Sequence, residues 1–85
     1  MVFDELDYGV TKRVDLHGLN REEAMAELCN AIYHLDSNYS GLMVVHGYHS
    51  GKVLRKLVRE EFVHPRIEKR VSVDASITFL KIKKD

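Results

Sequence analysis

Two short segments of this chain combine ionisable side chains with glycine, a combination suited to acid–base chemistry. In the first, residues 14–19 (VDLHGL), Asp15 and His17 are two positions apart. On an extended backbone both side chains project to the same side, where a carboxylate orients an imidazole and raises its basicity. The pair suits a general base, a set of metal ligands, or a hydrogen-bonded clamp on the turn that follows. The spacing alone leaves all three roles open.

The second segment, residues 44–52 (VVHGYHSGK), is a glycine loop that follows an apolar run. Glycine lets the backbone approach a ligand and lysine adds positive charge, so the loop suits an anion, although a tight turn between strand and helix needs the same residues. It is not the phosphate loop of nucleotide hydrolases, because three residues separate Gly47 from Gly51 where that motif has four. Ser50 is one position too late for a nucleophile elbow, and the histidines lack the spacing of a zinc site.

The surrounding pattern predicts the elements that position these segments. An amphipathic helix is expected at 21–35, because apolar residues recur at helical spacing and Asn20 and Glu23 suit a capping box at its start. Continuous apolar residues at 42–45 predict a strand buried on both faces, and a second helix is expected between the glycine loop and Pro65. Two later β-like runs are close enough to form a hairpin. The predicted order is β-α-β-α-β-β, with strands at 11–16, 42–45, 67–73 and 76–82.

Alternation of strands and helices requires right-handed crossovers, which make the first two strands parallel. Their carboxyl ends therefore lie on one edge of the sheet, and this edge brings together Asp15, His17 and His46. The loop at 47–51 leads into a helix amino terminus, whose free N–H groups and dipole favour an anion. The sequence thus predicts one candidate site built from both segments.

The length and composition bound the class of protein. At 85 residues the chain is long enough for one small domain, with 1–10 as a short arm and 11–85 as the folded part. The lone Cys29 excludes an internal disulfide, fits a reducing compartment and is expected in the core. The acidic start differs from a signal peptide, and no apolar run approaches the roughly 20 residues of a membrane span. These features predict a cytoplasmic protein without a membrane partner.

The formal net charge of zero conceals an uneven distribution of charge. Residues 1–45 carry three Lys or Arg against eight Asp or Glu, and residues 46–85 carry ten against five. Clustered cations can neutralise phosphates, although a charged run is often only a solvated face of a helix. The candidates for phosphate contacts are Lys52, Arg55, Lys56 and Arg59, together with the tail residues Lys81, Lys83 and Lys84.

Taken together, these residues resemble the small MutS-related (Smr) domain over about residues 11–83. The L-D-x-H motif of the family falls on residues 14–17, with Val14 in the first position, and its T/H-G-x-G motif falls on residues 46–49, with His49 in place of the last glycine. A glycine-rich stretch that the family carries before its last strand has no counterpart at 73–76. The resemblance implies an α/β fold, an α+β two-layer sandwich like the carboxyl-terminal domain of translation initiation factor 3, with a mixed four-stranded sheet and two helices on one face.

The resemblance also implies nucleic-acid binding and, in many members, endonuclease activity on RNA or DNA. Applied to this chain it places catalysis on Asp15, His17 and His46: His17, oriented by Asp15, is the general base, while His46 and the loop amides hold the scissile phosphate. Asp15 is also the candidate ligand for a divalent cofactor, Mg²⁺ or Mn²⁺. Tyr48 is expected to stack on a base, and the expected nucleic-acid-binding residues are Gly47, Tyr48, His49, Ser50, Gly51, Lys52, Arg55, Lys56 and Arg59.

The sequence leaves two alternatives to a hydrolase that acts on phosphodiester bonds in RNA or in branched or flapped DNA. In one, the same edge binds nucleic acid without cleaving it, and Asp15 and His17 only brace the loop. In the other, the acidic face of residues 21–36 or the last strand binds a protein. A small neutral domain makes few phosphate contacts, which favours a homodimer or a larger complex.

Overall fold

A computed structural model describes residues 8–47 and 51–83 of the chain. Their elements follow the predicted order: β1 (Thr11–Asp15), α1 (Arg21–Tyr33), β2 (Gly41–Val45), α2 (Gly51–Lys56), a π-helical turn (Leu57–Glu61), β3 (Ile67–Asp74) and β4 (Ile77–Ile82). Within these residues, no helix has the length and apolar character that are needed to cross a membrane.

The four strands form one mixed sheet in the order β1-β2-β4-β3. The first two strands are parallel, with Asp15 opposite Val45, which confirms the parallel pairing predicted from the sequence. The last two strands form the predicted antiparallel hairpin, and β4 also pairs antiparallel with β2. The final strand of the sequence therefore lies inside the sheet rather than at its edge.

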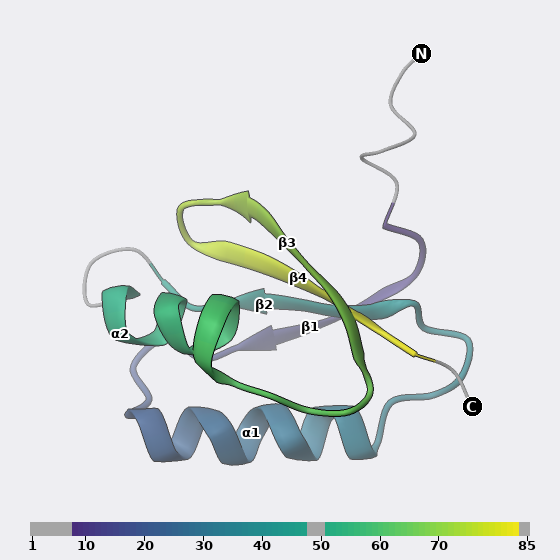
Figure 1. Ribbon diagram of the computed structural model, residues 1–85, viewed down its shortest axis with the longest axis horizontal. Helices are drawn as coiled ribbons and strands as arrows, with labels where there is room; N and C mark the ends of the chain where they lie inside the picture. The colour runs from purple at the N-terminus through teal and green to yellow at the C-terminus, as the bar shows by residue number, and fades with distance from the viewer. Residues whose placement is uncertain (1–7, 48–50, 84–85) are drawn as a thin grey trace.

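The helices cover one face of the sheet and form the second layer (Figure 1). Val14 and Val44 are opposite each other in β1 and β2, and both are buried in the same apolar core. Leu28 of α1 and Leu57 of the π-helical turn are fully buried in this core. The structure thus confirms the two-layer sandwich with both helices on one face.

Two expectations about burial were wrong. The run at 42–45 in β2 was expected to be buried on both faces, but within it only Leu42 and Val44 are buried, while Met43 and Val45 are half-buried. The reason is that both helices pack on the same side, so the other side has no helical layer. Cys29 was expected in the core and is exposed, because it follows Leu28 around the helix and points away from the sheet.

The ends of the helices follow local rules of hydrogen bonding. Asn20 and Glu23 form the predicted capping box: the Asn20 side chain accepts from the Glu23 N–H at 2.8 Å, and the Glu23 carboxylate accepts from the Asn20 N–H at 2.9 Å. The first helix ends at Tyr33, before the predicted end at residue 35. The second helix widens into a π-helical turn, closed by the Phe62 N–H, which donates to the Leu57 carbonyl at 2.7 Å.

Candidate functional site

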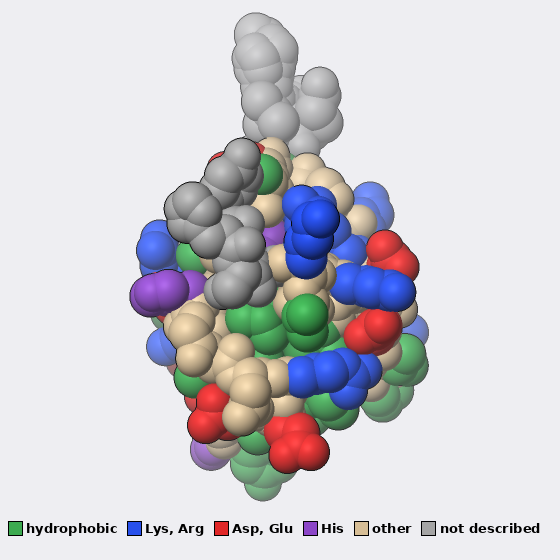
Figure 2. Space-filling view, turned by 90° about the vertical axis from the view of Figure 1, so that its left-hand side faces the viewer, with side chains coloured by type: hydrophobic (Ala, Val, Ile, Leu, Met, Phe, Trp, Pro, Cys, Tyr) green, Lys and Arg blue, Asp and Glu red, His purple; other side chains and the backbone are tan. Residues whose placement is uncertain are grey.

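The carboxyl ends of β1 and β2 lie side by side, as the sequence predicted. The Leu16 N–H donates to the Val45 carbonyl at 2.8 Å, so the segments that follow β1 and β2 stay side by side up to His17 and His46. Figure 2 faces this end of the molecule, where basic, acidic and histidine side chains gather on one surface. The parallel pairing therefore brings the two glycine segments into one place.

Asp15 and His17 form a hydrogen-bonded pair on this surface. Oδ1 of Asp15 lies 3.3 Å from Nδ1 of His17 and also accepts from the His17 backbone N–H at 3.0 Å. That backbone N–H is the main reason why the pKa of the Asp15 carboxyl is lowered, so the carboxylate stays ionised. The His17 side chain is 75% exposed and the Asp15 side chain 48% exposed. The pair is open to an external substrate.

His46 lies in the interior, with 1% of its surface exposed. Its Nε2 is 2.9 Å from Oγ1 of Thr78, and its Nδ1 is 3.3 Å from the Gly47 carbonyl oxygen. Burial lowers the pKa of the imidazole, and the positive charges of Arg59 and Arg55 lower it further. The sequence placed this ring at the scissile phosphate, whereas the structure bonds it to Thr78 beneath the surface.

Gly47 connects the buried and exposed parts of the site. Its φ of +90° is a conformation that favours glycine, and a Cβ built there would lie 3.4 Å from Cβ of His17. The backbone N–H groups of His46 and Gly47 point to the carbonyl of Ser76, at 2.9 and 3.3 Å. The backbone after β2 is thus held between His17 and the β3–β4 turn.

The basic residues of the second helix occupy different environments. Lys52 is exposed, and Lys56 is exposed with its ammonium 3.9 Å from the Glu61 carboxylate. Arg55 is half-buried. Arg59 instead turns inward, where its Nε donates to Oγ1 of Thr78 at 2.6 Å. Of the expected loop residues, Gly51 begins α2, and three lie outside the described residues: Tyr48, His49 and Ser50.

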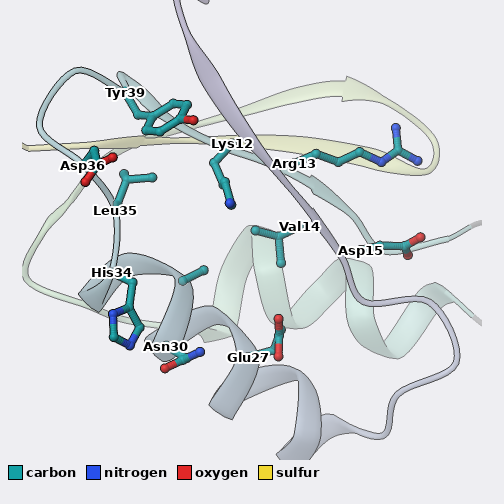
Figure 3. A pocket seen from close by; sticks show the side chains of 11 residues that line it. Lys12, Arg13, Val14, Asp15, Glu27, Asn30, His34, Leu35, Asp36 and Tyr39 are labelled. Atoms are coloured by element: carbon teal, nitrogen blue, oxygen red, sulfur yellow. The ribbon is translucent and has the colours of Figure 1, made fainter.

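A pocket of about 340 Å³ opens between β1 and α1, beside the candidate site (Figure 3). Lys12 and Val14 point into it, and side chains of both charges line it, including Arg13 and Glu27. Asp15 is at its margin, whereas His17 and Gly47 are not among its lining residues. The pair of Asp15 and His17 therefore lies on an open surface rather than in an enclosed cavity.

The described residues contain no complete set of protein ligands for Mg²⁺ or Mn²⁺. Among residues 8–47 and 51–83, no group of three or more His, Cys, Asp or Glu side chains is placed to hold a metal ion. Asp15 offers a single carboxylate, whose Oδ1 already accepts two hydrogen bonds from His17. Mg²⁺ is commonly held by one or two carboxylates together with water and substrate phosphates, so Asp15 alone would need such outside ligands to hold this ion.

Two residues of the site were missed in the sequence. Thr78 is completely buried near the start of β4, beside His46, and Asp74 contributes an exposed carboxylate at the β3–β4 turn. The N–H of Ser76 donates to this carboxylate at 2.8 Å and is the main cause of its lowered pKa. The sequence did contain a signal for Thr78. Residues 78, 80 and 82 are two positions apart on a strand, so Thr78 shares the core-facing side with Leu80 and Ile82.

In a comparison with models of protein families, the model described as the Smr domain matches residues 14–74. The match covers most of the 85 residues and includes both glycine segments, the second helix and β3. No curated protein and no solved structure matches the chain.

Proposed function

Because the chain belongs to the Smr domain family, we propose that it binds nucleic acid and cleaves its phosphodiester bonds. The observation that supports the cleavage is the exposed pair of Asp15 and His17 beside Gly47. Small ligands are usually held in concave pockets, whereas a polymer can be bound across an open surface. The open position of the pair fits a nucleic-acid strand better than it fits a small molecule.

In the proposed reaction His17 is the general base. Its Nδ1–H donates to Asp15, which leaves Nε2 as the basic nitrogen. This nitrogen takes a proton from water or from a ribose 2′-hydroxyl, and the resulting oxygen nucleophile attacks the phosphorus. The bond between phosphorus and the leaving oxygen breaks, and the leaving oxygen gains a proton from solvent. Asp15 orients the imidazole and stabilises its positive charge after the proton transfer.

The proposed phosphate contacts come from the second helix. Lys52 and Lys56 are exposed and Arg55 is half-buried, so their charges are available at the surface. The loop residues Tyr48, His49 and Ser50 stay part of the proposed binding surface, with Tyr48 stacking on a base. A second copy of the chain or a larger complex would extend these few contacts along the strand.

The first test is cleavage of end-labelled single-stranded RNA, duplex DNA and flapped DNA, with and without Mg²⁺ or Mn²⁺. We expect the wild-type protein to cut at least one substrate, and Asp15→Asn and His17→Gln to lower the rate by about 100-fold or more. His34→Gln is the matched control, because His34 is also an exposed histidine but lies at the end of α1. Equal cleavage by all three variants and the wild type would show that the pair is not catalytic.

One observation favours a second function, namely binding without cleavage. The same Oδ1 of Asp15 accepts from the backbone N–H of His17, so the carboxylate also braces the turn after β1. In this case Asp15→Asn would retain the affinity for nucleic acid, and no substrate would be cut by the wild-type protein. Filter binding beside the cleavage assay separates the two functions.

A further inference from the structure

A chain of hydrogen bonds runs beneath the candidate site from the second helix to the glycine loop. Nε of Arg59 donates to Oγ1 of Thr78 at 2.6 Å, Oγ1 lies 2.9 Å from Nε2 of His46, and Nδ1 of His46 lies 3.3 Å from the Gly47 carbonyl oxygen. A carbonyl only accepts hydrogen bonds, so Nδ1 carries the proton. Nε2 then accepts from the Thr78 hydroxyl, whose oxygen accepts from Arg59. A single neutral tautomer of His46 satisfies all three contacts.

Arg59 is the fixed end of this chain. Its Nη2 donates to the Ile77 carbonyl at 3.1 Å and to the Asp74 carbonyl, so two of its three nitrogens are bonded inside the fold. The sequence grouped Arg59 with Arg55 as a phosphate contact, but the two guanidinium groups differ in this structure. Among residues 8–47 and 51–83 the Arg55 side chain has no hydrogen-bond or ion-pair partner, whereas Arg59 connects the helical segment to the β3–β4 turn.

The other end of the chain reaches the proposed general base through the backbone. Gly47 is held by the His46 ring at its carbonyl and by the Ser76 carbonyl at its N–H. A Cβ built at Gly47 would lie 3.4 Å from Cβ of His17, so the Gly47 backbone is a direct neighbour of the His17 side chain. A shift of Gly47 would therefore change the position that is open to the His17 side chain.

We propose that Arg59 and Thr78 are positioning residues of the site, which act through His46 and Gly47 on the placement of His17. The expected effect of these residues on turnover rests on the proposed function of His17. Their expected effect on the tautomer of His46 does not depend on that function. In this arrangement His46 touches no substrate. Through its hydrogen bonds to Thr78 and to the Gly47 carbonyl, His46 holds Gly47 at a fixed position relative to the helical segment of Arg59 and to β4.

The substitution of Thr78 tests this proposal most directly. Thr78→Val keeps the shape of the side chain and removes the hydroxyl, while Thr78→Ser keeps the hydroxyl and is the matched control. The readout is the pair of imidazole ¹⁵N chemical shifts of His46, which report the tautomer, together with the ring signals of His17. We expect Thr78→Val to lose the single Nδ1–H tautomer and to shift the His17 signals, and Thr78→Ser to preserve both.

On a substrate that the wild type cleaves, Thr78→Val should lower kcat by about tenfold or more with little change in KM, because a small misplacement near the reacting atoms is costly. Thr78→Ser should keep most of kcat. The proposal is overturned if the His46 and His17 signals of Thr78→Val match the wild type, or if Thr78→Ser is as damaging as Thr78→Val. Amide spectra confirm that each variant is folded.

A second comparison separates positioning from phosphate binding. Arg55→Gln and Arg59→Gln each remove one positive charge, the first from α2 and the second from the π-helical turn that continues it. We expect Arg59→Gln to alter the His46 signals and to leave the salt dependence of nucleic-acid affinity unchanged, while Arg55→Gln lowers the slope of log affinity against log salt by about 0.7 to 0.9. If Arg59→Gln lowers the slope in the same way and leaves the His46 signals unchanged, Arg59 is a phosphate contact and the proposal is wrong.

The failure of this inference can be distinguished from the failure of the proposed function. The ¹⁵N and ring measurements need no nucleic acid. If the wild type cuts nothing, the proposed cleavage fails, and the dependence of the His46 tautomer on Thr78 still supports or overturns the hydrogen-bonded chain.

Discussion

The two histidines of the candidate site are placed in opposite environments, and this difference determines which of them can exchange a proton. His17 is 75% exposed beside a carboxylate that stays ionised. His46 is 1% exposed, and its pKa is lowered by burial and by neighbouring positive charge. A protonated His46 would require a desolvated charge and the loss of its acceptor role toward Thr78. The exposed ring therefore suits acid–base chemistry and the buried ring suits a structural role.

We expect the buried histidine to make the stability of the protein depend on pH. Because the folded pKa of His46 is below its ordinary value of 6.5, the unfolded state binds a proton more readily as the pH falls. The contribution of His46 is then fully present above pH 6.5 and is lost as the pH falls toward the folded pKa. Urea unfolding at several pH values measures this effect.

The matched variants for this measurement are His46→Gln and His34→Gln. His46→Gln should flatten the loss of stability at acid pH, even though it weakens the fold at neutral pH by removing the contact with Thr78. His34→Gln, at an exposed position, should keep the pH dependence of the wild type. A parallel loss of stability in all three proteins would contradict the assignment of the effect to His46.

Among single residues, the sequence predicted those whose interactions are local. Asp15 and His17 are two positions apart, so their pairing follows from the geometry of an extended chain. The partners of His46 are not local, because Thr78 is 32 residues away and Arg59 lies 19 residues before Thr78. The alternation of Leu42, Val44 and His46 on one side of the strand did contain the signal that the imidazole points inward.

At the scale of the elements, the start of α1 depends on its capping box. Asn20→Ala removes the side-chain acceptor for the Glu23 N–H, so we expect a loss of about 1 kcal/mol in the free energy of unfolding. Asn30→Ala is the control, because Asn30 is exposed within the same helix and alanine favours helix. Thermal and urea unfolding of the two variants give the comparison. Equal effects would indicate that the cap contributes nothing beyond helix propensity.

The order of elements was predictable from the sequence, and the order of strands in the sheet was not. Capping and hairpin formation involve residues close together in the chain, whereas the insertion of β4 between β2 and β3 depends on pairing across the whole fold. The π-helical turn at Leu57–Glu61 also gave no signal in the helical spacing of apolar residues. The structure shows that Arg59 extends from this turn to the β3–β4 turn, where it donates to the carbonyls of Asp74 and Ile77. These long-range contacts are not visible in the sequence.

At the scale of the whole molecule, a formal net charge of zero means that attraction to a polyanion depends on where the cations lie. We expect the double variant Lys52→Gln, Lys56→Gln to lower the slope of log affinity against log salt by about 1.4 to 1.8, as for the loss of two phosphate contacts. Lys69→Gln, Lys83→Gln changes the net charge equally at the opposite end of the sheet and should leave the slope unchanged. Equal slopes for the two double variants would contradict binding through the second helix.

The position of β4 has a consequence for how this chain is made in the cell. A ribosome releases β1, α1, β2, α2 and β3 before β4, yet β4 is the strand that joins β2 to β3. While β4 is still in the exit tunnel, the nascent chain cannot close its sheet, and the apolar face formed by Leu42 and Val44 lacks its neighbour Leu80. We therefore expect the four-stranded sheet to be completed only after β4 has left the ribosome, and the apolar face to stay uncovered until then.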